Sequence, residues 1–171
     1  MKLVKYRVRN YKTVLDSHWI NVINENSIDG NQCISGSENL LEGLYKFNSS
    51  NKNYKYSLKS DWPTGLPGLK RSERICYMLF EILDDEWREF EKLIGIKIKI
   101  ESCTVIKLLS NDFRFRLDSK AKKELKKNKS YPDIVTEIEK ILLNKLPTFI
   151  YLEDYMSINS SINNCIILKK L

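Results

Sequence analysis

A glycine followed by an amphipathic run near position 40 constrains this chain more than any other stretch. Gly36 precedes Ser37, Glu38 and Asn39, after which apolar side chains recur at helical spacing. Those apolar positions are Leu40, Leu41, Leu44 and Phe47. A glycine turn that opens directly onto a helix is the arrangement by which helix N–H groups bind phosphate. We therefore expect a helix over residues 37–47, preceded by a loop of phosphate-binding shape.

The residues of this loop lack the two groups that phosphate binding needs. In the motif G-x-x-x-x-G-K-[ST], the lysine neutralises the β- and γ-phosphates and the hydroxyl binds magnesium. Counted from Gly36, those positions hold Ser37 and Glu38, which removes a cation and adds a carboxylate. Gly30 also lies one residue too early for the standard spacing. We expect a degenerate nucleotide-binding loop, with ATP and magnesium bound weakly or not at all, formed by Gly30, Asn31, Gly36, Ser37, Glu38 and Asn39.

The composition is that of one folded domain spanning residues 1–171. Hydrophobic residues make up 42% of the chain, which is enough for a core. Lys and Arg number 29 against 22 Asp and Glu, giving a net charge of +7. This surplus favours acidic partners such as nucleic acid, and solubility alone explains it equally well.

Cysteine and histidine usage points away from a metal site. The four cysteines form no C-x-x-C pair, and the single histidine, His18, has no cysteine or acidic cluster near it. We expect free thiols in a reducing compartment. The charged N-terminus does not resemble a signal peptide, and no apolar run approaches the ~18 residues of a membrane helix. We therefore expect a cytoplasmic protein without membrane contact.

Hydrophobic patterning predicts an α/β fold with α+β character. Apolar runs predict strands at residues 3–14, 18–22, 74–83, 96–100, 104–109, 113–117 and 148–152, with a weak strand between 23 and 28. Helical spacing predicts three to four helices, at residues 37–47, from 84 to 94, at 119–129 as a solvated helix or linker, and at 131–145 behind a capping box. Turns are expected at residues 16–17 and 111–112. We expect strands 96–100, 104–109 and 113–117 to form an antiparallel meander within one mixed sheet.

Several predicted strands carry basic residues on the side opposite to their apolar side chains. The run at 119–129 adds six lysines. Such faces can neutralise phosphate groups in a salt-dependent way. The candidate nucleic-acid contacts are Lys5, Arg7, Arg9, Lys97, Lys99, Arg114, Arg116, Lys122 and Lys123.

Three stretches, in order along the chain, resemble parts of a known ATPase family. They are Asn10-Tyr11-Lys12-Thr13, Asn39-Leu40-Leu41-Glu42-Gly43-Leu44 and Leu146-Pro147-Thr148-Phe149-Ile150-Tyr151-Leu152-Glu153-Asp154-Tyr155. They are similar to the N-[FY]-[KR]-[SC], N-L-L-E-A-L and L-P-x-F-[IV]-Y-F-D-D-Y stretches of the overcoming-lysogenization-defect and RecF ATPases, relatives of the SMC and ABC heads. The resemblance implies the N-terminal lobe of such an AAA-family P-loop ATPase head, with a degenerate Walker A loop and without the C-terminal half that carries Walker B.

The resemblance and the altered loop together imply a lobe without ATP hydrolysis that acts as a partner or regulator of a larger ATPase, in phage defence or DNA repair. Its protein partner, a full-length ATPase or a second copy, would bind an uncovered apolar sheet edge at Ile166, Ile167 and Leu168. Two alternatives stay open. One is a nucleic-acid-binding module that uses the basic strand faces, with DNA as partner. The other is an ATP-binding or ATPase subunit completed in trans.

Overall fold

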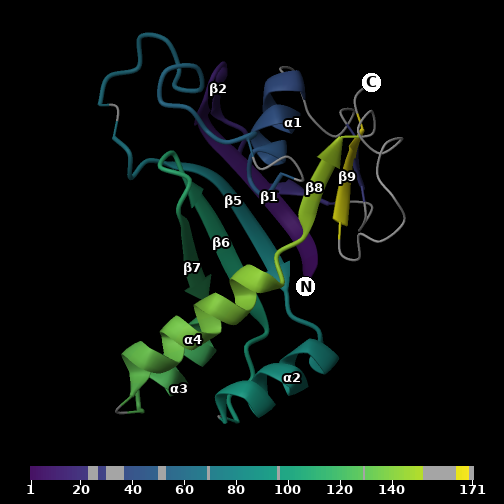
Figure 1. Ribbon diagram of the computed structural model, residues 1–171, viewed down its shortest axis with the longest axis vertical. Helices are drawn as coiled ribbons and strands as arrows, with labels where there is room; N and C mark the ends of the chain where they lie inside the picture. Colours follow the sequence, from purple (N-terminus) through teal and green to yellow (C-terminus); the bar gives the residue numbers. More distant parts are fainter. Residues whose placement is uncertain are drawn as a thin grey trace.

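The computed structural model describes residues 1–22, 27–29, 37–49, 53–68, 70–95, 97–128, 130–151 and 165–169. Within these residues it contains a six-stranded antiparallel sheet, a three-stranded parallel sheet and four α-helices (Figure 1). The expected mixture of helices and strands with an antiparallel sheet is therefore confirmed. The expectation of one mixed sheet is wrong, because the parallel and antiparallel pairings of the described strands belong to two separate sheets.

The larger sheet is built around two long strands near its centre. Its strands are β1 (Lys2–Tyr11), β2 (Val14–Asp16), β3 (Ile20–Asn21), β5 (Arg74–Glu81), β6 (Ser102–Leu108) and β7 (Phe113–Leu117). They lie in the order β2-β1-β5-β6-β7, with β3 also paired to β1. The turn after β1 falls at residues 12–13. The turn predicted at residues 16–17 was misplaced, because Asp16 continues the ladder opposite Arg9.

A register shift in β1 changes which residues face the core. Simple alternation predicts that Val4, Tyr6 and Val8 share the buried side. Tyr6 and Val8 are fully buried, but the pairing of β1 with β5 shifts between Leu3 and Lys5. Such a bulge reverses the alternation locally, so Leu3 is buried in place of Val4.

The strand predicted at residues 96–100 is wrong. Residues 97–100 form no strand, and the meander consists of β5, β6 and β7. Both edges of β5 are already paired, one with β1 and one with β6, so an additional strand finds no edge beside it. The segment instead leads from helix α2 to β6 and anchors through Ile100, which is fully buried. The turn predicted at residues 111–112 is confirmed by the left-handed Asn111 (φ 71°) between β6 and β7.

The smaller sheet joins three segments that are far apart in the sequence. It is formed by β4 (Ser27–Asp29), β9 (Cys165–Lys169) and β8 (Thr148–Tyr151), in that order, and both pairings are parallel. Residues 166–168 therefore belong to the central strand of this sheet. The expectation of an uncovered sheet edge at Ile166, Ile167 and Leu168 was wrong, because β4 and β8 pair with the two edges of β9.

Helix α1 (Ser37–Tyr45) lies between the two sheets and packs on β1, β5 and β8 (Figure 1). The predicted apolar stripe is confirmed, since Leu40, Leu41, Leu44 and Phe47 are all buried. Gly43 permits the close approach of α1 to β1. A Cβ at this position would lie 3.2 Å from both Tyr11 and Val8, which are fully buried.

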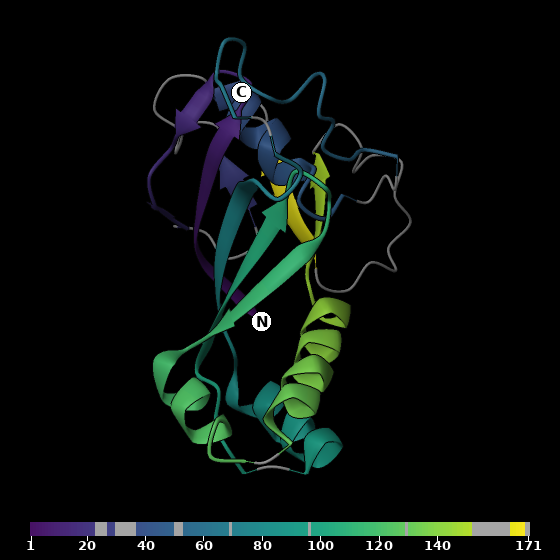
Figure 2. The ribbon, with the colours of Figure 1, turned by 90° about the vertical axis from the view of Figure 1, so that its left-hand side faces the viewer.

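The other helices gather at the opposite end of the molecule (Figure 2). They are α2 (Asp84–Ile94), α3 (Ser119–Leu125) and α4 (Tyr131–Asn144). All three were predicted, although Ser130 makes no side-chain capping bond at the start of α4. In α2, Trp87 and Phe90 are buried, whereas Leu93 is 65% exposed. Among the helices of the described segments, none is long and apolar enough to cross a bilayer.

Candidate functional site

The predicted nucleotide-binding loop is only partly within the described residues. Gly30, Asn31 and Gly36 lie outside them. Ser37 and Glu38 are the first two residues of α1, which places both backbones in its first turn. The backbone N–H groups of a first turn have no partner within the helix and attract anions.

The first half of α1 is fastened to the hairpin turn after β1. Nδ2 of Asn39 donates to Oγ1 of Thr13 at 2.7 Å. One turn further along, the carboxylate of Glu42 accepts from Nζ of Lys12. Asn39 therefore holds the helix in place, and its amide is already occupied by a protein partner.

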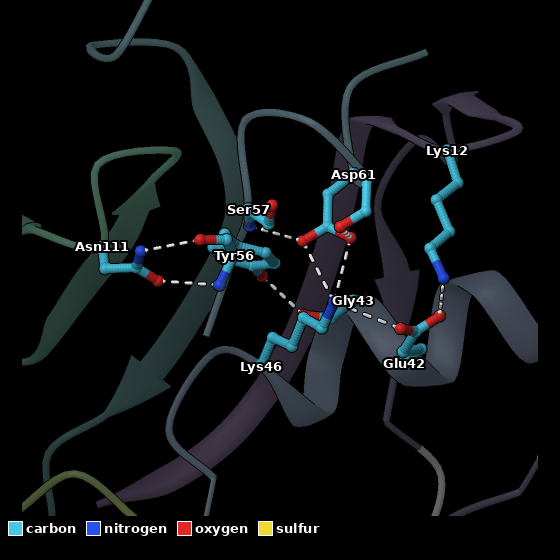
Figure 3. A network of polar contacts seen from close by, with 9 residues as sticks. Lys12, Glu42, Gly43, Lys46, Tyr56, Ser57, Asp61 and Asn111 are labelled. Atoms are coloured by element: carbon cyan, nitrogen blue, oxygen red, sulfur yellow. Dashed lines mark hydrogen bonds and ion pairs between the residues drawn. The ribbon is translucent and has the colours of Figure 1, made fainter. Parts of the chain in front are cut away.

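The end of α1 is fastened by a buried ion pair (Figure 3). Nζ of Lys46 lies 2.9 and 3.0 Å from the two carboxylate oxygens of Asp61. Asp61 is fully buried and Lys46 is 8% exposed. The same carboxylate accepts from the backbone N–H of Ser57 at 2.7 Å and from the hydroxyl of Ser60 at 3.1 Å. A buried charge is tolerated when it is paired and hydrogen-bonded in this way.

Glu42 joins its ion pair with Lys12 and the Lys46–Asp61 ion pair into one network. Its Oε1 lies 3.2 Å from Nζ of Lys46, and its Oε2 bonds Lys12. Burial alone would raise the pKa of Glu42, but the two ammonium groups outweigh burial and hold this pKa below its usual value. Burial likewise acts to lower the pKa of Lys46, and the carboxylates of Asp61 and Glu42 outweigh it, so that this pKa is raised. Both groups stay charged at neutral pH.

Tyr56 joins this network to the turn between β6 and β7. Its hydroxyl donates to the carbonyl of Gly43 at 2.5 Å. The amide side chain of Asn111 bonds both the N–H and the carbonyl of Tyr56, each at 2.9 Å. Carbonyls in the last turn of a helix lack helical partners, so the Tyr56 hydroxyl satisfies one of them. The network thus fixes the position of α1 and leaves no charged group free for a ligand.

Sequence reasoning missed this network. Lys46 is adjacent to the predicted apolar stripe, and Asp61 stands in a stretch recognised only as a loop from its prolines and glycines. The two are 15 positions apart, and no local pattern pairs them. The one available signal was a lysine between the stripe residues Leu44 and Phe47, where burial would require a carboxylate partner.

The basic residues of β1 are largely neutralised within the sheet. The guanidinium of Arg7 bonds both carboxylate oxygens of Asp16, and Nε of Arg9 lies 3.3 Å from the same carboxylate. The hydrogen bond from Arg7 holds the pKa of Asp16 at about 2. Nζ of Lys5 lies 5.0 Å from the ring centre of Trp19, which is a cation–π distance.

Strand register brings basic residues of β1 and β7 onto the same face. One row across the sheet runs Arg7, Tyr77, Ile106 and Arg114. The next row runs Lys5, Leu79, Thr104 and Arg116. We call this side, opposite to α1, the outer face. Arg114 and Arg116 are exposed, and no carboxylate of the described residues lies within ion-pair distance of either.

The remaining predicted nucleic-acid contacts lie elsewhere. Lys99 forms an ion pair with Asp84 at the start of α2. Lys97 is exposed in the segment between α2 and β6. Lys122 and Lys123 are exposed on α3. These four lysines are outside the strands whose register forms the outer face.

A second buried lysine was also missed by sequence reasoning. Lys107 is 8% exposed on the core side of β6, directly opposite Cys76 of β5. Its Nζ lies 3.7 Å from the ring centre of Phe113. Burial, together with the charge of Lys55, lowers the pKa of Lys107 to about 8. The alternation of β6 places Lys107 in line with core residues, a signal that was available but not used.

Cys76 and Cys103 are free and buried, and burial raises the pKa of the Cys103 thiol to about 12. No group of three or more His, Cys, Asp or Glu side chains in the described part of the chain is arranged to hold a metal ion. Comparisons of the chain with protein-family models, with curated proteins and with solved structures found no match in any of the three.

Proposed function

We propose that this chain is a non-hydrolytic, ATPase-head-like lobe that serves as a partner or regulator of a larger ATPase. The observation that carries the proposal is the start of α1. After strand β4, the helix opens on Ser37 and Glu38, where a phosphate loop presents its lysine and its hydroxyl residue. Strand β4, a glycine-containing segment and helix α1 follow one another in the order found in a phosphate-loop motif. A setting in phage defence or DNA repair rests on the family resemblance alone.

Helix α1 itself contains no lysine, and Lys46 just beyond it does not replace the missing cation. Lys46 directly follows the last residue of this nine-residue helix, about 13 Å along the axis from its first turn. Its ammonium is also held by Asp61 and Glu42. The developing charge of phosphoryl transfer is stabilised by such a lysine and by magnesium, so hydrolysis loses its main electrostatic support.

Calorimetric titration with ATP and magnesium tests this proposal. We expect the unchanged chain to show no saturable binding tighter than about 1 mM. The double variant Ser37→Lys, Glu38→Thr restores both motif residues, and it should bind more tightly than the control variant Ser37→Ala, which restores neither. Micromolar binding of ATP by the unchanged chain would overturn the proposal.

Nucleic-acid binding is a second candidate function, favoured by the register that brings Lys5, Arg7, Arg114 and Arg116 onto the outer face. Trp19, which is 39% exposed, adds an aromatic ring on this side and lies 6.2 Å from the ring centre of the buried Tyr77. Basic groups interleaved with aromatic rings are typical of surfaces that bind single-stranded nucleic acid.

Filter binding to single-stranded and duplex DNA at two salt concentrations tests the second candidate. The variant Arg114→Glu, Arg116→Glu should lose most of the affinity seen at low salt. The matched control Lys122→Glu, Lys123→Glu changes the net charge equally on α3 and should retain it. No binding at low salt, or equal losses in both variants, would exclude a specific role for the outer face.

A further inference from the structure

Strand β7 is an edge of the larger sheet with unpaired backbone groups. It pairs with β6 on one side, and no described strand pairs with its other side. The N–H of Leu108 donates to the carbonyl of Asp112, and the N–H of Asp118 donates to the carbonyl of Ser102. In an antiparallel ladder the bonded pairs alternate, so Arg114 and Arg116 also bond toward β6. The N–H and C=O groups of the alternate residues 113, 115 and 117 point away from β6.

The edge strand also carries two charges of the outer face, Arg114 and Arg116, that have no carboxylate partner among the described residues. Arg7 and Arg9 share Asp16, whereas Arg114 and Arg116 are exposed and unpaired within the described residues. Unpaired charge and unpaired backbone therefore coincide on one strand. Figure 2 shows this strand on the side of the molecule that faces the viewer.

The core side of the same strand is incompletely covered. Phe113, Phe115 and Leu117 pack against the core but remain partly exposed. A strand added to this edge would place its residues beside those of β7 in the same alternation. Its apolar residues would cover Phe113, Phe115 and Leu117, and its acidic residues would face Arg114 and Arg116.

We propose that β7 accepts an extended segment of a partner protein, with acidic and apolar residues in alternation, as an additional strand of the sheet. This inference rests on the proposed function as a partner lobe, and it moves the partner site from β9 to β7. Main-chain hydrogen bonds supply affinity in such strand addition, and alternate side chains supply specificity.

Two other occupants fit the edge less well. A nucleic acid satisfies the arginines but has no ladder of amide groups to pair with residues 113, 115 and 117. A second copy of β7, paired antiparallel, would bring the arginines of one copy beside those of the other. Like charges opposite one another destabilise a strand pair. An acidic segment satisfies the backbone and the charges together.

Fluorescence polarisation with a labelled, N-acetylated peptide of alternating Val and Glu tests the proposal on the full chain. We expect saturable binding that weakens at least tenfold in Arg114→Glu, Arg116→Glu. The control Lys122→Glu, Lys123→Glu should bind as the unchanged chain does. A peptide of alternating Val and Lys should bind the Arg→Glu variant better than it binds the unchanged chain.

Backbone methylation of the peptide separates strand addition from charge attraction without altering the protein. N-methyl groups on alternate amides remove hydrogen bonds along one edge of the peptide and leave its charge unchanged. The peptide has two sets of alternate amides, one along each edge. Methylation of one set should weaken binding at least tenfold, and methylation of the other set should not. Equal binding of all peptides, or no binding of the unmodified one, would overturn the proposal. Displacement of DNA from the outer face without any effect of methylation would assign the arginines to nucleic acid.

The outcomes for this site and for the proposed function are distinguishable. Micromolar ATP binding would overturn the degenerate-loop proposal. It would not affect the proposal for β7 if peptide binding still depended on which set of alternate amides is methylated. Absence of ATP binding together with absence of peptide binding would keep the partner-lobe proposal and reject β7 as its partner site.

Discussion

Replacing Asp61 by asparagine gives the sharpest test of how α1 is held in the molecule. The substitution keeps the size of the side chain and removes the charge that faces Lys46. The lysine then remains 8% exposed, with only Glu42, 3.2 Å away, as a carboxylate partner among the described residues. Removing one partner of a buried ion pair costs about 3–5 kcal/mol of unfolding free energy. Because Lys46 keeps its contact with Glu42, we expect a loss of about 3 kcal/mol.

Urea unfolding followed by circular dichroism measures this loss. With a slope of about 2 kcal/mol per molar urea, the midpoint should fall by roughly 1.5 M. The control Asp84→Asn breaks an exposed pair with Lys99 and should leave the midpoint unchanged. The double variant Lys46→Met, Asp61→Leu removes both charges and should be more stable than Asp61→Asn alone. A loss below about 1 kcal/mol in Asp61→Asn would refute the view that this buried pair anchors α1.

Three further changes have expected outcomes that the same unfolding assay can measure. Asp16, paired with Arg7, has a folded pKa near 2, below its unfolded value. Its contribution of about 1 kcal/mol is therefore complete above pH 4 and is lost between pH 4 and 2, so Asp16→Asn and the unchanged chain should converge in acid. Lys107 has a folded pKa near 8, below its unfolded value, so Lys107→Met should stabilise the fold by about 2 kcal/mol at pH 7, and this gain should shrink between pH 8 and 10.5. A gain in stability that is independent of pH would contradict the lowered pKa of Lys107. Tyr56→Phe leaves the Gly43 carbonyl without its buried donor and should cost about 1–2 kcal/mol, whereas a neutral result would show that water replaces the hydroxyl.

Elements whose pattern is local could be predicted from the sequence. The apolar stripe of α1 and the continuous apolar run of β5 each identify their element without knowledge of the rest of the chain. Residues 97–100 show where this reasoning fails, because strict alternation does not by itself bring a segment beside a sheet edge. The bulge between Leu3 and Lys5 is a similar case, because pairing with β5 determines it.

The candidate sites depended still more on contacts between distant segments. The degenerate loop was predicted from consecutive residues, and most of that loop lies outside the described part of the chain. The network of Lys46 and Asp61 requires the 53–61 segment to lie against α1, which no spacing in the sequence indicates. The sequence identifies the basic residues, but only strand register shows that Arg114 and Arg7 lie in one row across the sheet, whereas Lys99 and Lys122 lie outside it.

The central position of β9 in the smaller sheet determines the order in which that sheet can assemble. β4 and β8 each pair with β9. During synthesis, residues 27–29 leave the ribosome well over a hundred residues before 165–169. Strand β4 therefore cannot pair until β9 has been synthesised. Contacts between such distant positions pay a large loop-closure entropy and form late. The larger sheet and α1, which lie within residues 2–117, can therefore fold first and serve as the surface on which the smaller sheet assembles.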